Sequence, residues 1–154
     1  MRLSTIFAAL ALVAIACPAS AADDPKPAFD AALAQRLGAD DYGMRSYVFV
    51  LLKTGPTPVA KGAERDAMFK GHFANMKRLA AEGKLLYAGP LDGIDGWRGL
   101  FIFAATSIDE AKAFTATDPV IQSGEMVAEF HQHYGSAALG LVNETHKTIQ
   151  KKEM

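Results

Sequence analysis

Two short hydrophobic runs, at residues 46–52 and 100–104, are apolar on both of their alternating sides. Successive side chains of a β-strand point to opposite faces of the sheet, so such a run is typical of a strand covered on both faces. Gly55 and Pro56 end the first run. We therefore predict two buried strands at these places.

Two further strands are predicted in different surroundings. Residues 85–88 form a hydrophobic run that Gly89 and Pro90 close, and proline favours the edge of a sheet because it cannot donate to a neighbouring strand. Residues 126–134 form the last strand, and its two sides differ. One side carries Ala128, Phe130 and Tyr134, and the other carries Glu129, His131 and His133.

Three segments carry helix signals. Residues 64–82 place hydrophobic side chains at helical spacing before Gly83 ends the pattern. These side chains are Phe69, Phe73, Met76, Leu79 and Ala80. Ser107 and Glu110 match a capping box, in which each side chain bonds the other's backbone amide at the start of a helix. Residues 28–37 can form a short helix that Gly38 ends.

The order strand-helix-strand-strand-helix-strand predicts an α+β fold of the ferredoxin-like βαββαβ type, with an antiparallel four-stranded sheet. This arrangement places the first and third strands in the middle of the sheet, and these are the two strands without a polar side. Helices cover only one face of such a sheet. We therefore expect a second copy of the chain to cover the other face, which gives a homodimer.

The first 21 residues have the pattern of a secretory signal. Arg2 precedes an apolar run at residues 3–16, and Ala19-Ser20-Ala21 is a small-x-small cleavage pattern. We expect cleavage after Ala21 and a periplasmic or secreted protein; lipidation at Cys17 is the weaker alternative. The mature chain then holds no cysteine, which suits an oxidising compartment.

The remaining chain is expected to hold one domain. Residues 22–43 are interpreted as a mobile leader with a short helix, residues 44–139 as the domain, and residues 140–154 as a charged C-terminal tail. Lys and Arg number 16 against 17 Asp and Glu, a balance that argues against a nucleic-acid partner. No second run is long enough to span a membrane, so no membrane contact is expected after cleavage.

Several short motifs, in this order along the chain, resemble those of the YciI-like proteins. They are residues 47–55, Gly71-His72-Phe73, residues 82–85 leading to residues 88–91, residues 98–102, and Thr117-Asp118-Pro119 with Gly124. The resemblance implies a dimeric α/β barrel built of ferredoxin-like halves. It also implies an active-site pair of one histidine and one aspartate, which correspond to His72 and Asp118.

Both residues of this pair also have a structural interpretation. His72 lies three residues after Phe69 and four before Met76, which puts it on or beside the buried side of its helix. There it is either a general acid or base oriented by Asp118, or a histidine satisfied by a backbone carbonyl. Asp118 precedes Pro119 and is a favoured N-cap, a role compatible with orienting a histidine.

The other candidate residues lie on strands and strand ends. His131 and His133, with Glu129, form a pattern that can ligate zinc or copper, but no further ligand stands at a diagnostic spacing, so we expect no metal. Trp97 and Arg98 can hold a small anionic or aromatic ligand through stacking and charge, or can be ordinary residues of a strand end. Besides these two, we expect Gly89 and Pro90 to border the substrate.

The sequence therefore favours an enzyme that acts on a small organic molecule in an apolar pocket between the sheet and the helix at residues 64–82. Proton transfer by His72 and Asp118 fits an isomerase or a lyase. No dinucleotide, phosphate-loop or nucleophile-elbow motif is present in the sequence, so no cofactor is expected. The alternative is a non-catalytic ligand-binding or interaction module on the same dimeric barrel.

Overall fold

The computed structural model describes residues 27–152. The predicted signal segment at residues 1–21, with its cleavage site, lies outside the described residues. Within the described part, no helix combines the length and the apolar character that a membrane crossing requires.

Four antiparallel strands form a single sheet in the order β2-β3-β1-β4. The strands are β1 (Met44–Thr54), β2 (Leu85–Pro90), β3 (Trp97–Phe103) and β4 (Met126–Ser136). The first and third strands occupy the middle, so the predicted ferredoxin-like topology is confirmed. β2 lies at an edge, as Pro90 led us to expect.

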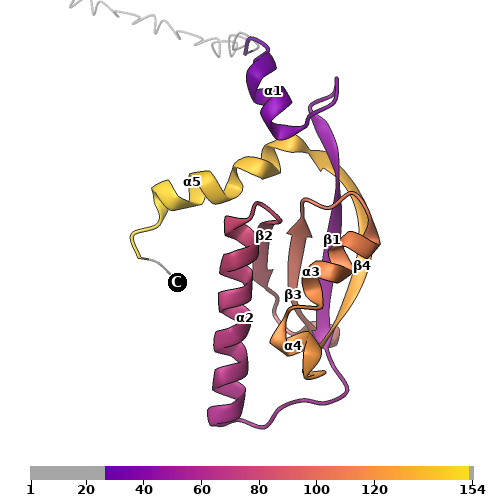
Figure 1. Ribbon diagram of the computed structural model, residues 1–154, viewed down its shortest axis with the longest axis vertical. Coiled ribbons are helices and arrows are strands. Elements are labelled where there is room, and N and C mark those ends of the chain that lie inside the picture. The colour runs from indigo at the N-terminus through magenta and orange to yellow at the C-terminus, as the bar shows by residue number, and fades with distance from the viewer. Residues whose placement is uncertain (1–26, 153–154) are drawn as a thin grey trace, which may run out of the picture.

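Helices α2, α3 and α4 pack on one face of this sheet (Figure 1). The helices of the structure are α1 (Ala31–Leu37), α2 (Ala63–Ala81), α3 (Ile108–Thr115), α4 (Pro119–Gln122) and α5 (Val142–Ile149), with short 3-10 turns at Ile94–Gly96 and Ala137–Leu141. α1 and α5 lie at one end of the sheet, beyond the helix layer (Figure 1).

The core fills the space between the sheet and the helix layer. Val48 and Val50 of β1 and Phe103 of β3 are fully buried there, and Leu79 of α2 packs against the same cluster. Full burial of a side chain of this size contributes about 1.5–3 kcal/mol relative to leaving it in water. These contacts fix the distance between α2 and the sheet, and so they fix where the side chains of α2 can reach.

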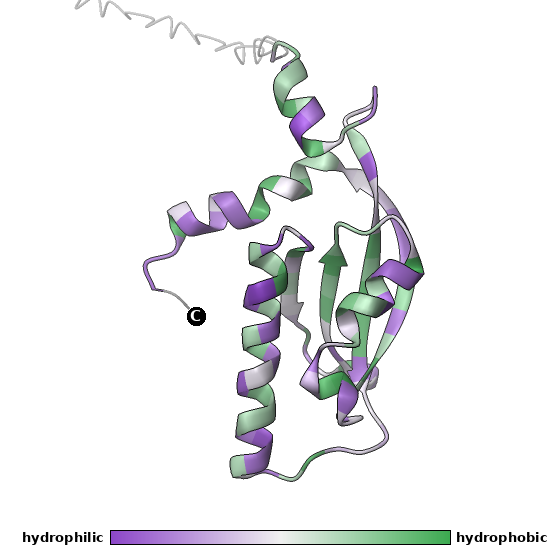
Figure 2. Cartoon of the chain, viewed as in Figure 1, coloured by the Kyte–Doolittle hydropathy of each residue, from purple (hydrophilic) through white to green (hydrophobic). Residues whose placement is uncertain are grey.

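The opposite face of the central strands is also apolar, as Figure 2 shows by the green colour of β1 and β3. Successive residues alternate between the faces, so this second face carries Tyr47, Phe49, Leu51, Leu100 and Ile102. Tyr47 and Leu51 are buried by neighbouring side chains, whereas Phe49, Leu100 and Ile102 remain only partly covered. None of the α-helices of residues 27–152 packs on this face in Figure 1.

Three local expectations need correction. β2 continues through Gly89 and Pro90, because both residues still pair with β3 at an edge where no donor is required from the proline. Ser107 accepts a bond from the Glu110 amide, but the Glu110 carboxylate accepts from the Thr106 amide instead of the Ser107 amide. Phe73, placed in the buried stripe by the sequence, is 61% exposed, and His72 takes the buried place beside it.

Candidate functional site

His72 and Asp118 face one another between α2 and the start of α4. The Nδ1 atom of His72 lies 2.9 Å from Oδ1 and 2.8 Å from Oδ2 of Asp118. Both residues are buried, with 6% and 1% of their surfaces exposed. An ionised carboxylate can only accept hydrogen bonds, so Nδ1 is the donor and the lone pair of the neutral ring is on Nε2.

Asp118 is held in place by its own helix. It is the N-cap of α4, where Oδ1 accepts a hydrogen bond from the Val120 amide at 3.1 Å and Pro119 occupies the first helical position. The predicted capping role is therefore confirmed. Because the cap fixes the carboxylate, the imidazole that bonds to it is fixed as well.

Gly71 allows α2 and α4 to approach closely enough for this contact. A Cβ atom at Gly71 would lie 3.0 Å from Cγ of Pro119, which is tighter than ordinary van der Waals contact. Gly71 therefore brings His72, the next residue on α2, within reach of Asp118, the residue before Pro119. In the sequence, Gly71 stands in the motif Gly71-His72-Phe73, which by itself does not indicate this role.

The surroundings of the His72 ring are aromatic. The rings of Phe69, Phe73 and Phe101 have their centroids 6.0, 5.3 and 6.1 Å from the imidazole centroid. Within residues 27–152, Nε2 has no hydrogen-bond partner, and no fully buried side-chain nitrogen or oxygen lacks one. Nε2 therefore still reaches the surface, where it can give or take a proton.

Arg98, a candidate ligand-binding residue, lies in a separate charged cluster. Nη1 of Arg98 is 3.5 Å from Oε1 of Glu125, and Nη2 of Arg65 is 2.7 Å from the same oxygen. The Val59 amide donates to the other oxygen of Glu125 at 2.7 Å. No motif marks Arg65 or Glu125 in the sequence, because they lie 60 residues apart, one on α2 and the other in the turn before β4.

Glu125 is 1% exposed and ionised at neutral pH. Burial by itself raises the pKa of this carboxyl, but the Val59 amide and the Arg65 and Arg98 guanidiniums outweigh that effect and hold the pKa below its ordinary range. The carboxylate therefore keeps both guanidiniums near the start of α2 and the start of β3.

The remaining candidate substrate residues are joined to Arg98 through the backbone. The Leu91 amide donates to the Arg98 carbonyl at 3.0 Å, which joins the Gly89-Pro90 end of β2 to the start of β3. Trp97 is 46% exposed, and no ring contact joins it to His72 in the described part of the chain. His72 contacts Asp118 and Arg98 contacts Glu125, while Gly89 pairs with Leu100, the neighbour of Phe101 on β3.

The histidines of β4 lie on the face of the sheet without helices. Nε2 of His131 is 2.8 Å from Oε1 of Glu129, and the His133 ring stacks on Tyr47 with a centroid distance of 6.2 Å. Among residues 27–152, no group of three His, Cys, Asp or Glu side chains is placed to share a metal ion. These residues therefore line a sheet face that carries apolar and titratable groups together.

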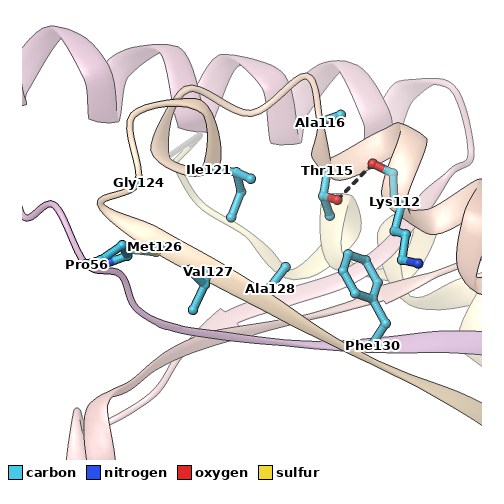
Figure 3. Close-up of a pocket in the computed structure, with 10 residues that line it drawn as sticks. All are labelled: Pro56, Lys112, Thr115, Ala116, Ile121, Gly124, Met126, Val127, Ala128 and Phe130. Carbon is cyan, nitrogen blue, oxygen red and sulfur yellow. Dashed lines mark hydrogen bonds between the residues drawn. The ribbon is translucent and has the colours of Figure 1, made fainter.

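An apolar groove of about 440 Å³ opens between α3, α4 and the edge strand β4 (Figure 3). Ile121, Met126 and Phe130 supply hydrophobic side chains, and Thr115 donates its hydroxyl hydrogen to the Lys112 carbonyl at its rim. From the sequence, the apolar pocket is expected between the sheet and the helix at residues 64–82. This groove lies elsewhere, and His72 is not among its lining residues.

Comparison with known proteins supplies a family match. A family model described as the YCII-related domain matches residues 47–130, more than half of the 154 residues. No curated protein matches the chain. A solved structure of 5-chloro-2-hydroxyhydroquinone dehydrochlorinase (TftG) from Burkholderia phenoliruptrix, in complex with 2,5-dihydroxybenzoquinone, is 22% identical to it. The match covers 56% of this chain and 90% of that one, with a TM-score of 0.37.

Proposed function

The chain belongs to the family of YCII-related domains, and on this premise we propose that it is an enzyme that transfers a proton on a small organic molecule. His72 is the general acid or base, and Asp118 is the residue that orients it. The observation that carries the proposal is the contact of Nδ1 with both oxygens of Asp118, combined with an Nε2 atom that still reaches the surface.

The contact between His72 and Asp118 has a direct chemical consequence. A carboxylate beside Nδ1 fixes the tautomer and stabilises the imidazolium that forms when Nε2 takes a proton. Nε2 removes a proton from a carbon next to an electron-withdrawing group. In an isomerisation, the imidazolium returns that proton to another carbon. In an elimination, the electron pair of the broken C–H bond forms a double bond as the leaving group departs, and the imidazolium gives the proton to the leaving group or to water.

The aromatic rings beside the imidazole support the same function. Phe69, Phe73 and Phe101 surround His72 with apolar surface, which suits a planar organic molecule better than a strongly hydrated one. An environment with little water also strengthens the electrostatic effect of Asp118 on a charged ring.

Two further features complete the proposal. A second copy of the chain covers the partly exposed side chains Phe49, Leu100 and Ile102, so that two sheets face each other in a dimeric barrel. The protein works in the periplasm or outside the cell, after removal of the segment that ends at Ala21.

The test follows exchange of carbon-bound hydrogen for deuterium by NMR, because this readout needs no knowledge of the natural substrate. Small cyclic ketones, enones and lactones are incubated in D₂O with the mature protein. The wild type should accelerate exchange or rearrangement of at least one compound, and His72→Gln should abolish the effect while keeping the fold. His146→Gln, an exposed histidine of α5, is the matched control and should behave like the wild type.

One observation favours the alternative of a non-catalytic binding module. The apolar groove lined by Ile121, Met126 and Phe130 does not include His72. The binding module would be supported, and the enzyme contradicted, if one of the test compounds binds but none exchanges hydrogen. In that case Phe130→Ala should abolish the binding of this compound and His72→Gln should leave it unchanged.

A further inference from the structure

The cluster around Glu125 carries more positive charge than its own carboxylate balances. Arg65 and Arg98 both contact Oε1 of Glu125, so two guanidiniums share one negative charge. Their side chains are each 27% exposed, whereas that of Glu125 is 2% exposed. The cluster therefore presents a surplus of one positive charge at a half-buried place.

The two arginines also have unused hydrogen-bond donors. A guanidinium carries five N–H donors. In the described part of the chain, Arg65 and Arg98 each give one hydrogen bond to Glu125 and none to any other side chain or carbonyl. Because no fully buried side-chain nitrogen lacks a partner, the unbonded nitrogens of both residues reach the surface. They are available to a ligand.

Arg65 lies on the side of α2 that leads to His72. The guanidinium carbon of Arg65 is 4.5 Å from the centroid of the Phe69 ring, and the edge of that ring meets the His72 ring. Arg65, Phe69 and His72 are spaced by four and three residues, so they share one face of the helix. A ligand held at Arg65 can therefore extend over Phe69 toward His72.

We propose that Arg65 and Arg98 bind the carboxylate group of a small organic acid, and that Glu125 is the positioning residue that holds the two guanidiniums together. A planar carboxylate matches the fork of an arginine, and one negative charge balances the surplus of the cluster. Binding of the acid does not depend on the proposed function. Only the later reaction of the bound acid rests on it, with the reacting carbon toward Nε2 of His72.

The experiment compares acids with their neutral amides. Benzoate with benzamide, and succinate with succinamide, are titrated into the mature protein, and binding is followed by ¹H–¹⁵N chemical shifts. At least one acid should bind about tenfold or more tightly than its amide. Arg65→Gln and Arg98→Gln should each weaken that acid about tenfold and leave the amide unchanged. Arg65→Lys, which keeps the charge but loses the fork, should recover only part of the affinity.

Two control variants distinguish this site from nonspecific attraction of an anion to a positive charge, and anion binding from catalysis. Arg36→Gln removes a guanidinium that is paired with Glu144 far from the cluster, and it should bind the acid like the wild type. His72→Gln should also retain acid binding, so acid binding without hydrogen exchange would support the anion site while contradicting the proposed enzyme. The proposal would be overturned if neither acid binds, or if acid and amide bind equally in both pairs. It would also be overturned if Arg36→Gln weakens acid binding as much as Arg65→Gln does.

Discussion

One carboxylate, that of Asp118, serves both the start of α4 and the ring of His72. Its Oδ1 atom accepts from the Val120 amide at 3.1 Å and from Nδ1 of His72 at 2.9 Å. The same side chain thus acts as a helix cap and as the partner of a buried imidazole 46 residues away. The cap restricts the carboxylate, and the carboxylate in turn restricts the ring.

Asp118→Asn should separate these two roles. Asparagine is as good an N-cap as aspartate, so the free energy of unfolding should fall by less than about 1 kcal/mol. The amide cannot stabilise an imidazolium, so proton-transfer activity should be lost. Long-range ¹H–¹⁵N spectra should show Nδ1 protonated in the neutral ring of the wild type and a larger share of the Nε2–H tautomer in the variant. The control is Asp30→Asn, which alters the cap of α1; an unchanged tautomer in Asp118→Asn would contradict the pairing.

Gly71→Ala should push α2 away from α4. The new methyl group would lie 3.0 Å from Cγ of Pro119, and overpacking of this kind costs about 1–3 kcal/mol. Alanine is also a better helix former than glycine, by up to about 1 kcal/mol, which offsets part of this cost. The free energy of unfolding, measured with urea, should therefore fall by about 1 kcal/mol. In a Pro119→Ala background the obstructing atom is absent, and Gly71→Ala should then be neutral or stabilising. Equal effects in both backgrounds would show that the close approach is unimportant.

Glu125→Gln should destabilise the protein in a pH-dependent manner. The pKa of Glu125 is lowered in the folded state, so its ionised form stabilises the fold at neutral pH, and this contribution is lost as the pH falls below the ordinary glutamate range. The free energy of unfolding of the variant should be lower than that of the wild type by about 2–4 kcal/mol at pH 7, and this difference should narrow as the pH falls below about 4. Urea unfolding at several pH values measures this gap. Glu144→Gln, at an exposed ion pair with Arg36, is the control and should have little effect on the free energy of unfolding.

The open face of the sheet should be a dimer interface. Light scattering at micromolar concentration is expected to give twice the mass of the mature chain. Ile102→Lys places a charge among the partly covered side chains of this face and should give a monomer. Phe73→Lys makes the same kind of change at an exposed position on α2, and its dimer should persist. A stable wild-type monomer would rule out the interface.

The mature protein should begin at Ala22. This expectation rests on the apolar run at residues 3–16 and the Ala19-Ser20-Ala21 pattern, which signal peptidase recognises. Mass analysis of protein from the cell envelope should find Ala22 as the first residue. Retained Met1, or a lipid on Cys17, would contradict the prediction.

Much of the fold follows from local pattern. A strand without a polar side must be covered on both faces, which places it in the middle of the sheet. Proline lacks the backbone N–H that donates to a neighbouring strand, which places Pro90 at an edge. Each argument concerns a single strand and needs no knowledge of the rest of the fold. The N-caps at Ser107 and Asp118 could be predicted for the same reason, since a cap is a contact between near neighbours in sequence. The resemblance of Gly71-His72-Phe73 to a YciI-like motif and the spacing of Phe69 and Met76 also directed attention to His72.

The distances between segments were decided by the tertiary structure. The burial of His72 in place of Phe73 depends on how α2 sits over β3, which helical periodicity defines only to within about one residue. The approach of α2 to α4 depends on what lies opposite Gly71. Arg65 of α2 and Arg98 of β3 meet at Glu125, in the turn before β4, and the three residues lie too far apart in the sequence for a local pattern to indicate this contact. Local propensity acts along the chain, whereas contacts of this kind form only when the whole core has set the positions of the elements.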